Sequence, residues 1–245
     1  MLEQKFSTFT VRPALPEDLT GIVSVHHESA KIYENLHSKE VWNATFSKEI
    51  LKQLWQKTFD EQQQNPLLMS FVAEENQTKK IIGVARCMVI TDEKAKDFFT
   101  KIIENSDRTQ QNDFTVPAVF GEFDKLYVHP NSKKMGVGSA LLRTMRKFLQ
   151  LKRVNQAIIV TLNGNKNAEQ FYQSFGAVSV GSFQQVSTAI AGCTDSGSSE
   201  VSKFNLWCVE NLSTMGKNPP HICIGKQEMP LHLKHHLDRQ RTEIK

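Results

Sequence analysis

A glycine-containing turn between an apolar strand and an apolar helix is the feature that most constrains the fold of this chain. Residues 126–142 read LYVHPNSKKMGVGSALL, in which a strand-like run ends at Pro130, and Gly136 and Gly138 then open a helix. The first turn of a helix carries backbone N–H groups without helical partners and the positive end of the helix dipole. Such a turn predicts binding of an anion, most often a phosphate, although the same glycines are typical of an ordinary strand-to-helix connection.

The residues around the glycines exclude the two commonest nucleotide-binding loops. A dinucleotide-binding turn needs Gly-x-Gly-x-x-Gly, and a P-loop needs Gly-x-x-x-x-Gly-Lys followed by Ser or Thr. The sequence KKMGVGSALL contains neither pattern. The choice between a phosphate site and a plain connection therefore depends on the rest of the chain.

The length and charge of the chain favour one main domain that does not bind nucleic acid. Its 245 residues are enough to bury a large core. The net charge of +4 is spread along the sequence rather than gathered in one basic stripe, so nucleic-acid binding is unlikely. A nucleic-acid-binding or ribosome-associated protein that uses the basic tail is kept as a third, less favoured class.

Cysteine spacing and hydropathy predict a cytoplasmic protein. Cys87, Cys193, Cys208 and Cys223 lie far apart, which indicates neither a disulfide framework nor a metal site. The histidines at 232–236 are interpreted as part of a solvated helix rather than as zinc ligands. The chain has no run of about eighteen apolar residues and no signal-peptide pattern at its start. We therefore expect no metal and no membrane segment.

Strand and helix patterns alternate along most of the chain. Strands are expected at 9–12, 69–75, 79–90, 120–130, 156–162, 177–187 and 203–211, the second and third as a hairpin. Helices are expected from Pro16, Ser47 and Thr91, after the glycine turn, and at 168–176, where Gly176 ends the helix. In the helix after the glycine turn, one side carries Leu141, Leu142, Met145, Phe148 and Leu149. This order predicts an α/β fold of the mixed α+β kind, with helices on both faces of a mixed sheet.

Two patterns in the expected order resemble the GNAT superfamily of acetyl-CoA-dependent N-acetyltransferases. The first is L-x-V-x-P at 126–130 followed by K-x-x-G-x-G at 133–138, with Lys133 where the family usually has Gln or Arg. The second is N-x-x-A-x-x-F-Y at 165–172, followed by Gly176. The resemblance implies the GNAT fold, a central mixed and mostly antiparallel sheet of about seven strands with helices on both faces. It covers residues 8–210, with an insertion at 91–118 between strands 3 and 4 and a C-terminal extension at 211–245.

The resemblance also implies a set of residues that bind acetyl-CoA. Backbone amides of the turn would hold the pyrophosphate, the strand before it would pair with the pantetheine arm, and the second motif would complete the site. The expected cofactor-binding residues are Leu126, Tyr127, Val128, Lys133, Lys134, Met135, Gly136, Val137, Gly138, Ser139, Asn165, Phe171 and Tyr172.

Four residues are candidates for the transfer chemistry. The family resemblance assigns the Val128 N–H to the thioester oxygen and the Tyr172 hydroxyl to protonation of the leaving thiolate. Glu122 and Asp124, two apart on one strand, are expected to point to the same face, with Glu122 as base and Asp124 as relay or substitute. The alternatives are that Tyr172 only packs beside Phe171 and that the two carboxylates are ordinary solvated acids.

The resemblance therefore predicts an N-acetyltransferase that acts on a primary amine of a protein, peptide or small molecule. The acceptor is expected to enter near residues 28–46, the 91–118 insertion and the loop at 188–200. A coenzyme A-binding sensor or regulatory module without turnover is the alternative, since Lys133 keeps the charge of Arg but loses its planar geometry.

Overall fold

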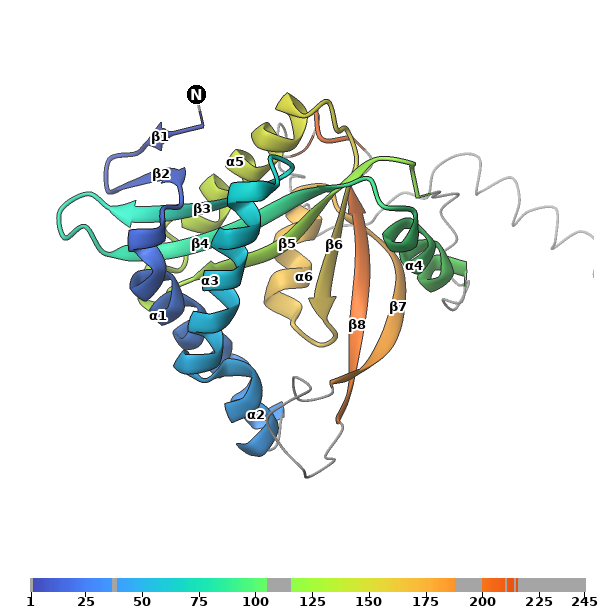
Figure 1. The fold of residues 1–245 in the computed structure, drawn as a ribbon, viewed down its shortest axis with the longest axis horizontal. Helices are drawn as coiled ribbons and strands as arrows, with labels where there is room; N and C mark the ends of the chain where they lie inside the picture. Colours follow the sequence, from blue (N-terminus) through green and yellow to red (C-terminus); the bar gives the residue numbers. More distant parts are fainter. Residues whose placement is uncertain are drawn as a thin grey trace, which may run out of the picture.

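A single sheet with strand order β1-β2-β3-β4-β5-β6-β8-β7 organises the chain (Figure 1). The computed structural model describes residues 2–36, 39–104, 116–187, 200–209, 211–213 and 215. Its strands are β1 (Gln4–Lys5), β2 (Phe9–Pro13), β3 (Leu68–Glu75), β4 (Ile81–Ile90), β5 (Phe120–Val128), β6 (Ala157–Leu162), β7 (Val178–Ser187) and β8 (Glu200–Val209). Every strand pair is antiparallel except β5 with β6. The predicted mixed, mostly antiparallel sheet is confirmed, with eight strands because the two-residue β1 is added.

The helices begin close to where capping residues and proline predict them. They are α1 (Leu19–Ala30), α2 (Lys39–Phe46), α3 (Lys48–Gln64), α4 (Glu93–Glu104), α5 (Val137–Leu151) and α6 (Lys166–Ser174), with short 3₁₀ turns η1 (Pro16–Asp18), η2 (Lys31–Leu36) and η4 (Pro130–Ser132). Ser47 caps α3 and Gly176 follows α6 in the left-handed conformation, φ 88°, as predicted. Helix α2 was not predicted, because its eight residues are too few to show a clear helical period.

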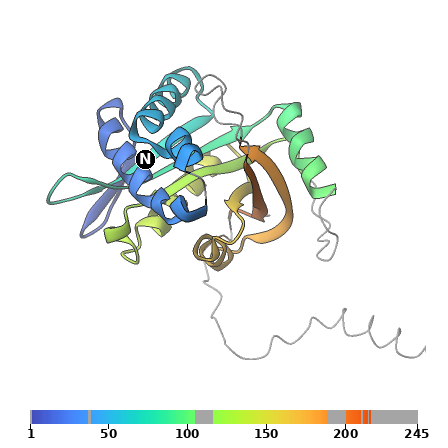
Figure 2. The same cartoon turned by 90° about the horizontal axis from the view of Figure 1, so that it is seen from below.

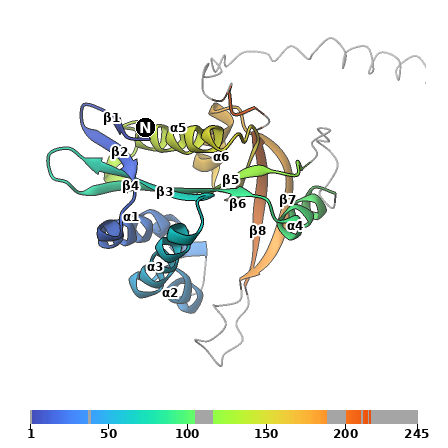
Figure 3. The ribbon, with the colours of Figure 1, turned by 45° about the horizontal axis from the view of Figure 1, so that its top comes forward.

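The helices lie on both faces of the sheet (Figure 3). Helices α5 and α6 pack on one face, and α1 and α3 pack on the other face over β3, β4 and β5. Helix α4 packs in the same buried apolar cluster as Ile158 of β6, whereas the neighbouring residues Ala157 and Ile159 of β6 face α5. Because successive strand residues face opposite sides, α4 covers the face opposite α5. Figure 2 shows α4 (green) at the far end of the sheet from β1 and β2.

Helix α5 supplies the largest apolar surface to the main core. All five residues predicted for its inner side are buried, and the side chains of Leu141, Leu142, Met145 and Leu149 are fully buried. The helix connects β5 to β6, which is the crossover that a parallel strand pair requires. Its packing therefore fixes the turn at its start relative to both strands.

Strands β5 and β6 pair over only a short distance and then separate. Their ladder contains Gly121, Glu122 and Phe123 of β5, although β5 continues to Val128. On the other side of β5, the ladder with β4 skips one residue, since Arg86 pairs with Lys125 and Cys87 pairs with Phe123. Asp124 is thus the extra residue of a β-bulge, which bends a strand and increases its twist. The separation begins at this bulge.

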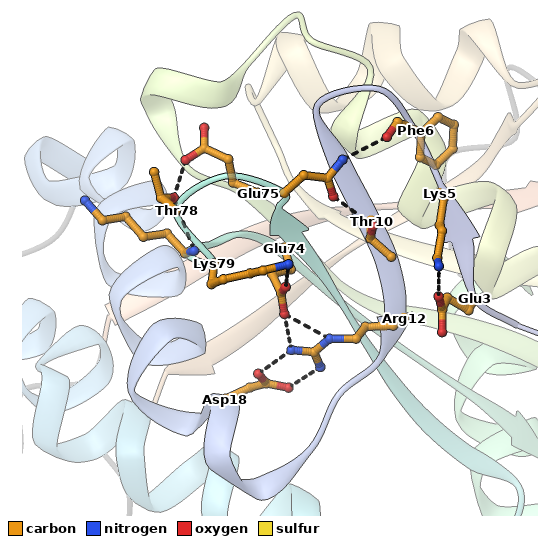
Figure 4. Close-up of polar contacts among 12 residues, drawn as sticks. Glu3, Lys5, Phe6, Thr10, Arg12, Asp18, Glu74, Glu75, Thr78 and Lys79 are labelled. Carbon is orange, nitrogen blue, oxygen red and sulfur yellow. Dashed lines mark hydrogen bonds and ion pairs between the residues drawn. The ribbon is translucent and has the colours of Figure 1, made fainter.

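An ion-pair network joins β2, η1 and the β3–β4 hairpin (Figure 4). Both Arg12 terminal nitrogens donate to the Asp18 carboxylate, at 2.7 and 2.8 Å, and Arg12 also binds Glu74 at 2.6 Å. The hydrogen bond from Arg12 holds the pKa of Glu74 below its usual value. Asp18 is buried and also accepts from the Leu15 backbone N–H. The network fixes the chain that leads into α1.

Replacement of Arg12 by alanine should destabilise the fold. The Asp18 carboxylate would stay buried without its cation, and the free energy of unfolding should fall by about 3 kcal/mol in a chemical denaturation experiment. Lys5→Ala is the matched control, because Lys5 pairs with Glu3 at 3.7 Å on an exposed surface and should leave the unfolding midpoint unchanged. Equal midpoints for the two variants would contradict the role of the network.

Candidate active site

A cavity of about 520 Å³ lies where β5 and β6 separate. Its lining comes from both faces of the sheet, since α2 and α4 contribute from one face and α6 from the other. The lining residues include Tyr33, Phe46, Phe98, Phe99, Glu122, Asp124, Leu126, Tyr127, Thr161, Asn165, Tyr172, Phe183 and Phe204. The cavity therefore passes through the gap between the two strands.

The edge of β5 along this gap has free backbone groups. The His129 N–H donates to the Ile82 carbonyl on β4 at 2.9 Å, and successive N–H groups of a strand point to opposite edges. The Val128 N–H therefore points away from β4, toward the gap. The Ser29 hydroxyl from α1 donates to the Val128 carbonyl at 2.8 Å and fixes this end of the strand. An extended thioester arm can pair with such an edge as an added strand does.

The turn after β5 presents unpaired N–H groups at its surface. Lys134 and Gly136 are left-handed, with φ of 64° and 82°, and Gly136 precedes the first residue of α5. The first helical hydrogen bond runs from the Ala140 N–H to the Gly136 carbonyl, so the N–H groups of Val137, Gly138 and Ser139 have no helical partner. Lys133 and Lys134 are exposed beside them, as is Met135. The arrangement suits an anionic phosphate.

The Glu122 carboxylate has no hydrogen bond or ion pair to any described residue, yet it is partly buried in the cavity. Burial, followed by the charge of Asp124, raises the pKa of Glu122 to about 7, although Lys125 and Arg86 oppose the shift. A carboxylate with this pKa exchanges protons near neutral pH, which is the property that a general base needs.

Asp124 lies in the same cavity but is already paired with two cations. The Lys125 ammonium lies 2.6 Å from the Asp124 carboxylate, and Arg86 Nε lies 3.3 Å from it. Arg86 also reaches Glu61 on α3 at 3.4 Å. The charge of Asp124 is therefore compensated, and its role as relay or substitute for Glu122 stays a prediction.

The bulge changes which side chains share a face of β5. Val84, Arg86 and Met88 alternate along β4, and their partners are Tyr127, Lys125 and Glu122. Glu122 therefore lies on the same face of the sheet as Lys125 and Tyr127. Without the bulge, strict alternation along β5 would place Glu122 on the face of Leu126 instead. The structure brings Glu122 and Asp124 to one cavity because the bulged residue turns toward the same side.

All three tyrosines of the chain line the cavity. Burial, followed by the neighbouring Tyr33, raises the pKa of Tyr172, so its hydroxyl stays protonated near neutral pH. The Tyr172 hydroxyl makes no hydrogen bond to a described residue. Tyr33 accepts a hydrogen bond from the Asn165 side chain. Tyr33 was missed in the sequence, because it lies in a short 3₁₀ turn outside both motifs.

Asn165 and Phe171 have structural contacts of their own. The Asn165 side chain caps α6 by accepting from the Ala168 N–H at 3.2 Å. Phe171 packs on the first turn of α5, where a Cβ built on Gly138 would lie 3.6 Å from its ring. Of the residues predicted to bind the cofactor, the cavity lining includes Leu126, Tyr127, Asn165 and Tyr172.

A buried histidine holds Tyr127 in place. The His26 ring stacks on the Tyr127 ring at 3.9 Å between centroids, and its Nδ1 accepts from Trp55 Nε1 at 3.1 Å. Burial, with smaller contributions from Lys125 and His27, lowers the pKa of His26 to about 3. His26 is therefore a neutral core residue that supports the wall of the cavity.

Among the described residues, no cluster of three or more His, Cys, Asp and Glu side chains could hold a metal ion. No helix in this part of the chain is both long enough and apolar enough to cross a bilayer. The histidine-rich segment at 232–236 and most of the loop at 188–200 lie outside the described residues.

Comparisons with known proteins agree with this architecture. The model of the Acetyltransferase (GNAT) family matches residues 30–177, more than half of the chain. The N-acetyltransferase from Staphylococcus aureus Mu50 has 18% identity and a TM-score of 0.51, covering 84% of this chain and 99% of that chain. The ribosomal-protein-S5-alanine acetyltransferase from Vibrio fischeri has 13% identity and a TM-score of 0.53, with coverages of 85% and 96%. No curated protein sequence matches significantly.

The matched residues contain the features from which the site is built. They include the bulged strand, the turn with its left-handed Gly136, and the α6 motif that carries Asn165 and Tyr172. The two solved structures share the fold across most of their length. The chain therefore belongs to the GNAT acetyltransferase family.

Proposed function

We propose that this protein is an N-acetyltransferase that moves the acetyl group of acetyl-CoA directly to a primary amine. The observation that carries the proposal is one cavity that holds an unpaired carboxylate, Glu122, and a protonated hydroxyl, Tyr172, beside the free edge of β5. These are a proton acceptor and a proton donor on either side of a place for a thioester.

In the proposed reaction, coenzyme A lies along the gap between β5 and β6. The turn from Lys133 to Ser139 holds the pyrophosphate through backbone N–H groups, and the lysines add positive charge. Leu126 and Val128 pair with the pantetheine arm through their free edge. The Val128 N–H donates to the acetyl oxygen, where negative charge develops.

The acceptor nitrogen attacks the acetyl carbon, and a C–N bond replaces the C–S bond. An alkyl ammonium has a pKa near 10.4, so it must lose a proton before it can attack. Glu122 takes that proton, directly or through a water molecule. The Tyr172 hydroxyl gives a proton to the coenzyme A thiolate as it leaves. Asp124, held by Arg86 and Lys125, sets the charge around Glu122.

The test of this proposal measures thiol release from acetyl-CoA by the purified protein with a panel of amines. The panel includes alkylamines, a polyamine, amino acids and peptides that begin with alanine. Acceptor-dependent release is the expected result. Coenzyme A binding without acetylation of any amine would instead support the sensor or regulatory module.

The rate should depend on the ionisation of Glu122. The unprotonated form is the base and the pKa lies near 7, so kcat/KM should rise with pH through about 7. Glu122→Gln should lower turnover at neutral pH about a hundredfold and remove this rise. Asp124→Asn should move the rise to lower pH, because the Asp124 charge raises the Glu122 pKa. An unchanged profile in Glu122→Gln would exclude Glu122 as the base.

Substitution of two tyrosines of the cavity tests which hydroxyl is the proton donor. Tyr172→Phe should lower kcat at least tenfold with little change in coenzyme A affinity, because the thiolate loses its proton source. Tyr33→Phe is the matched control, since it removes a hydroxyl that binds the Asn165 side chain in the same cavity. Single-turnover experiments measure the rate of the transfer step in both variants. A larger loss of rate in Tyr33→Phe would assign the acid to Tyr33.

Alanine substitutions at the two glycines of the turn should have different effects. At Gly136, φ is 82°, so alanine there should cost about 1 kcal/mol of stability and weaken coenzyme A binding severalfold. At Gly138, a Cβ would make ordinary 3.6 Å contacts with Phe171 and Val128, so alanine should preserve both properties. Calorimetry measures the coenzyme A affinity of the two variants, and thermal unfolding measures their stability. Equal affinities for the two variants would argue against phosphate binding at the turn.

A further inference from the structure

Phenylalanine rings form one end of the cavity. Phe98 and Phe99 come from α4, Phe183 from β7, Phe204 from β8 and Phe46 from α2. Phe183 stacks on Phe204 with centroids 5.4 Å apart, and the Phe98 ring meets the Phe183 ring edge-on at 5.9 Å. The four rings of α4, β7 and β8 form a continuous apolar wall from elements far apart in the sequence, which we call the phenyl wall. Phe46 instead packs beside His26 and Trp42.

The α4 side of the phenyl wall, formed by Phe98 and Phe99, lies at the opposite end of β5 from the glycine turn. Phe99 contacts Phe120, the first residue of β5, with ring centroids 5.6 Å apart. The turn follows Val128, the last residue of this nine-residue strand. A strand rises about 3.3 Å per residue, so roughly 25 Å separate the two ends. Coenzyme A approaches from the turn, which leaves the α4 side of the phenyl wall to the acceptor.

The charges near the phenyl wall suit one ammonium group. Glu122 is the third residue of β5, so it lies closer to the Phe99 end of the strand than to the turn. The other carboxylate of the cavity, Asp124, is already paired with Arg86 and Lys125. Glu122 is thus the carboxylate that a single cation would compensate, and among the described residues of the lining no further acid is left for a second cation.

Two other polar side chains of the cavity already have partners. The Thr161 hydroxyl accepts from Trp207 Nε1 at 2.8 Å, and the Asn165 side chain binds Tyr33 and caps α6. The rings of the phenyl wall themselves offer no hydrogen-bond partner, so peptide N–H and C=O groups placed against them would lose water without replacement. An apolar body loses no hydrogen bond there and gains contact with the rings.

We propose that the acceptor is a primary monoamine carried on an apolar body, either one aromatic ring or a short alkyl chain. The ammonium group faces Glu122, and the body lies against the phenyl wall. This inference rests on the proposed function, because it names the substrate class of that site. It assigns α4, the inserted helix, a role in acceptor selection through Phe98 and Phe99.

The first experiment compares four amines with wild-type protein: phenethylamine, hexylamine, spermidine and a short peptide that begins with alanine. We expect kcat/KM for phenethylamine and hexylamine to exceed the values for spermidine and the peptide by at least about tenfold. Amine binding is also measured by calorimetry in the presence of coenzyme A, so that binding is seen without turnover. Phenethylamine should bind and spermidine should bind more weakly.

The second experiment changes the phenyl wall at Phe98, which is 49% exposed and can be replaced with little effect on folding. Phe98→Ala should raise KM for phenethylamine about tenfold, with kcat and coenzyme A affinity unchanged. Phe6→Ala is the matched control, because Phe6 is 37% exposed and stacks on Phe9 at 4.7 Å, away from the cavity. Phe98→Glu should shift preference toward spermidine by adding a second carboxylate.

The outcomes separate this inference from the proposed function. Acetylation of the peptide or spermidine in preference to both apolar amines would overturn the inference and keep the transferase. Phenethylamine binding that weakens in Phe98→Ala but gives no acetylation would keep the inference and overturn the transferase. Coenzyme A binding with no binding or acetylation of any of the four amines would overturn both.

Discussion

The separation of β5 from β6 after Phe123 is the constraint on which the rest of the structure depends. A parallel pair that continued along the full length of β5 would use the N–H and C=O groups of Leu126 and Val128 in a ladder, and no gap would exist. The bulge at Asp124 bends β5 away, while α5 holds the far end of the strand against the core. The unpaired edge, the cavity and the position of the turn all follow from this bend.

The same bulge arranges the charges. It places Lys125 on the face of Glu122 and leaves Asp124 between Lys125 and Arg86, so the compensated acid lies beside the uncompensated one. Burial and the charge of Asp124 outweigh the opposing charges of Lys125 and Arg86, so the pKa of Glu122 rises to about 7. A single local irregularity of the backbone therefore sets both the shape of the gap and the proton affinity of its carboxylate.

Much of the fold could be predicted from the sequence, because its signals are local. The period of Leu141, Met145 and Phe148 predicts the buried side of α5, and Ser47 marks the start of α3. The bulge could not be predicted, because the alternation of GEFDKLYV is equally typical of an unbroken strand. Tyr33, Phe183 and Phe204 also escaped prediction, because their side chains reach the cavity only through the tertiary packing of η2, β7 and β8. The roles of Glu122 and Tyr172 stay predictions.

The donor and acceptor ends of the cavity are distributed differently along the sequence. The groups proposed to hold coenzyme A lie mostly within one short contiguous stretch, from Leu126 to Ser139. The phenyl wall is assembled from three separate elements, α4, β7 and β8. Substitutions or insertions in those elements can accumulate without moving the turn or the bulge. The architecture thus lets a gene lineage exchange one acceptor for another while its donor chemistry is inherited unchanged.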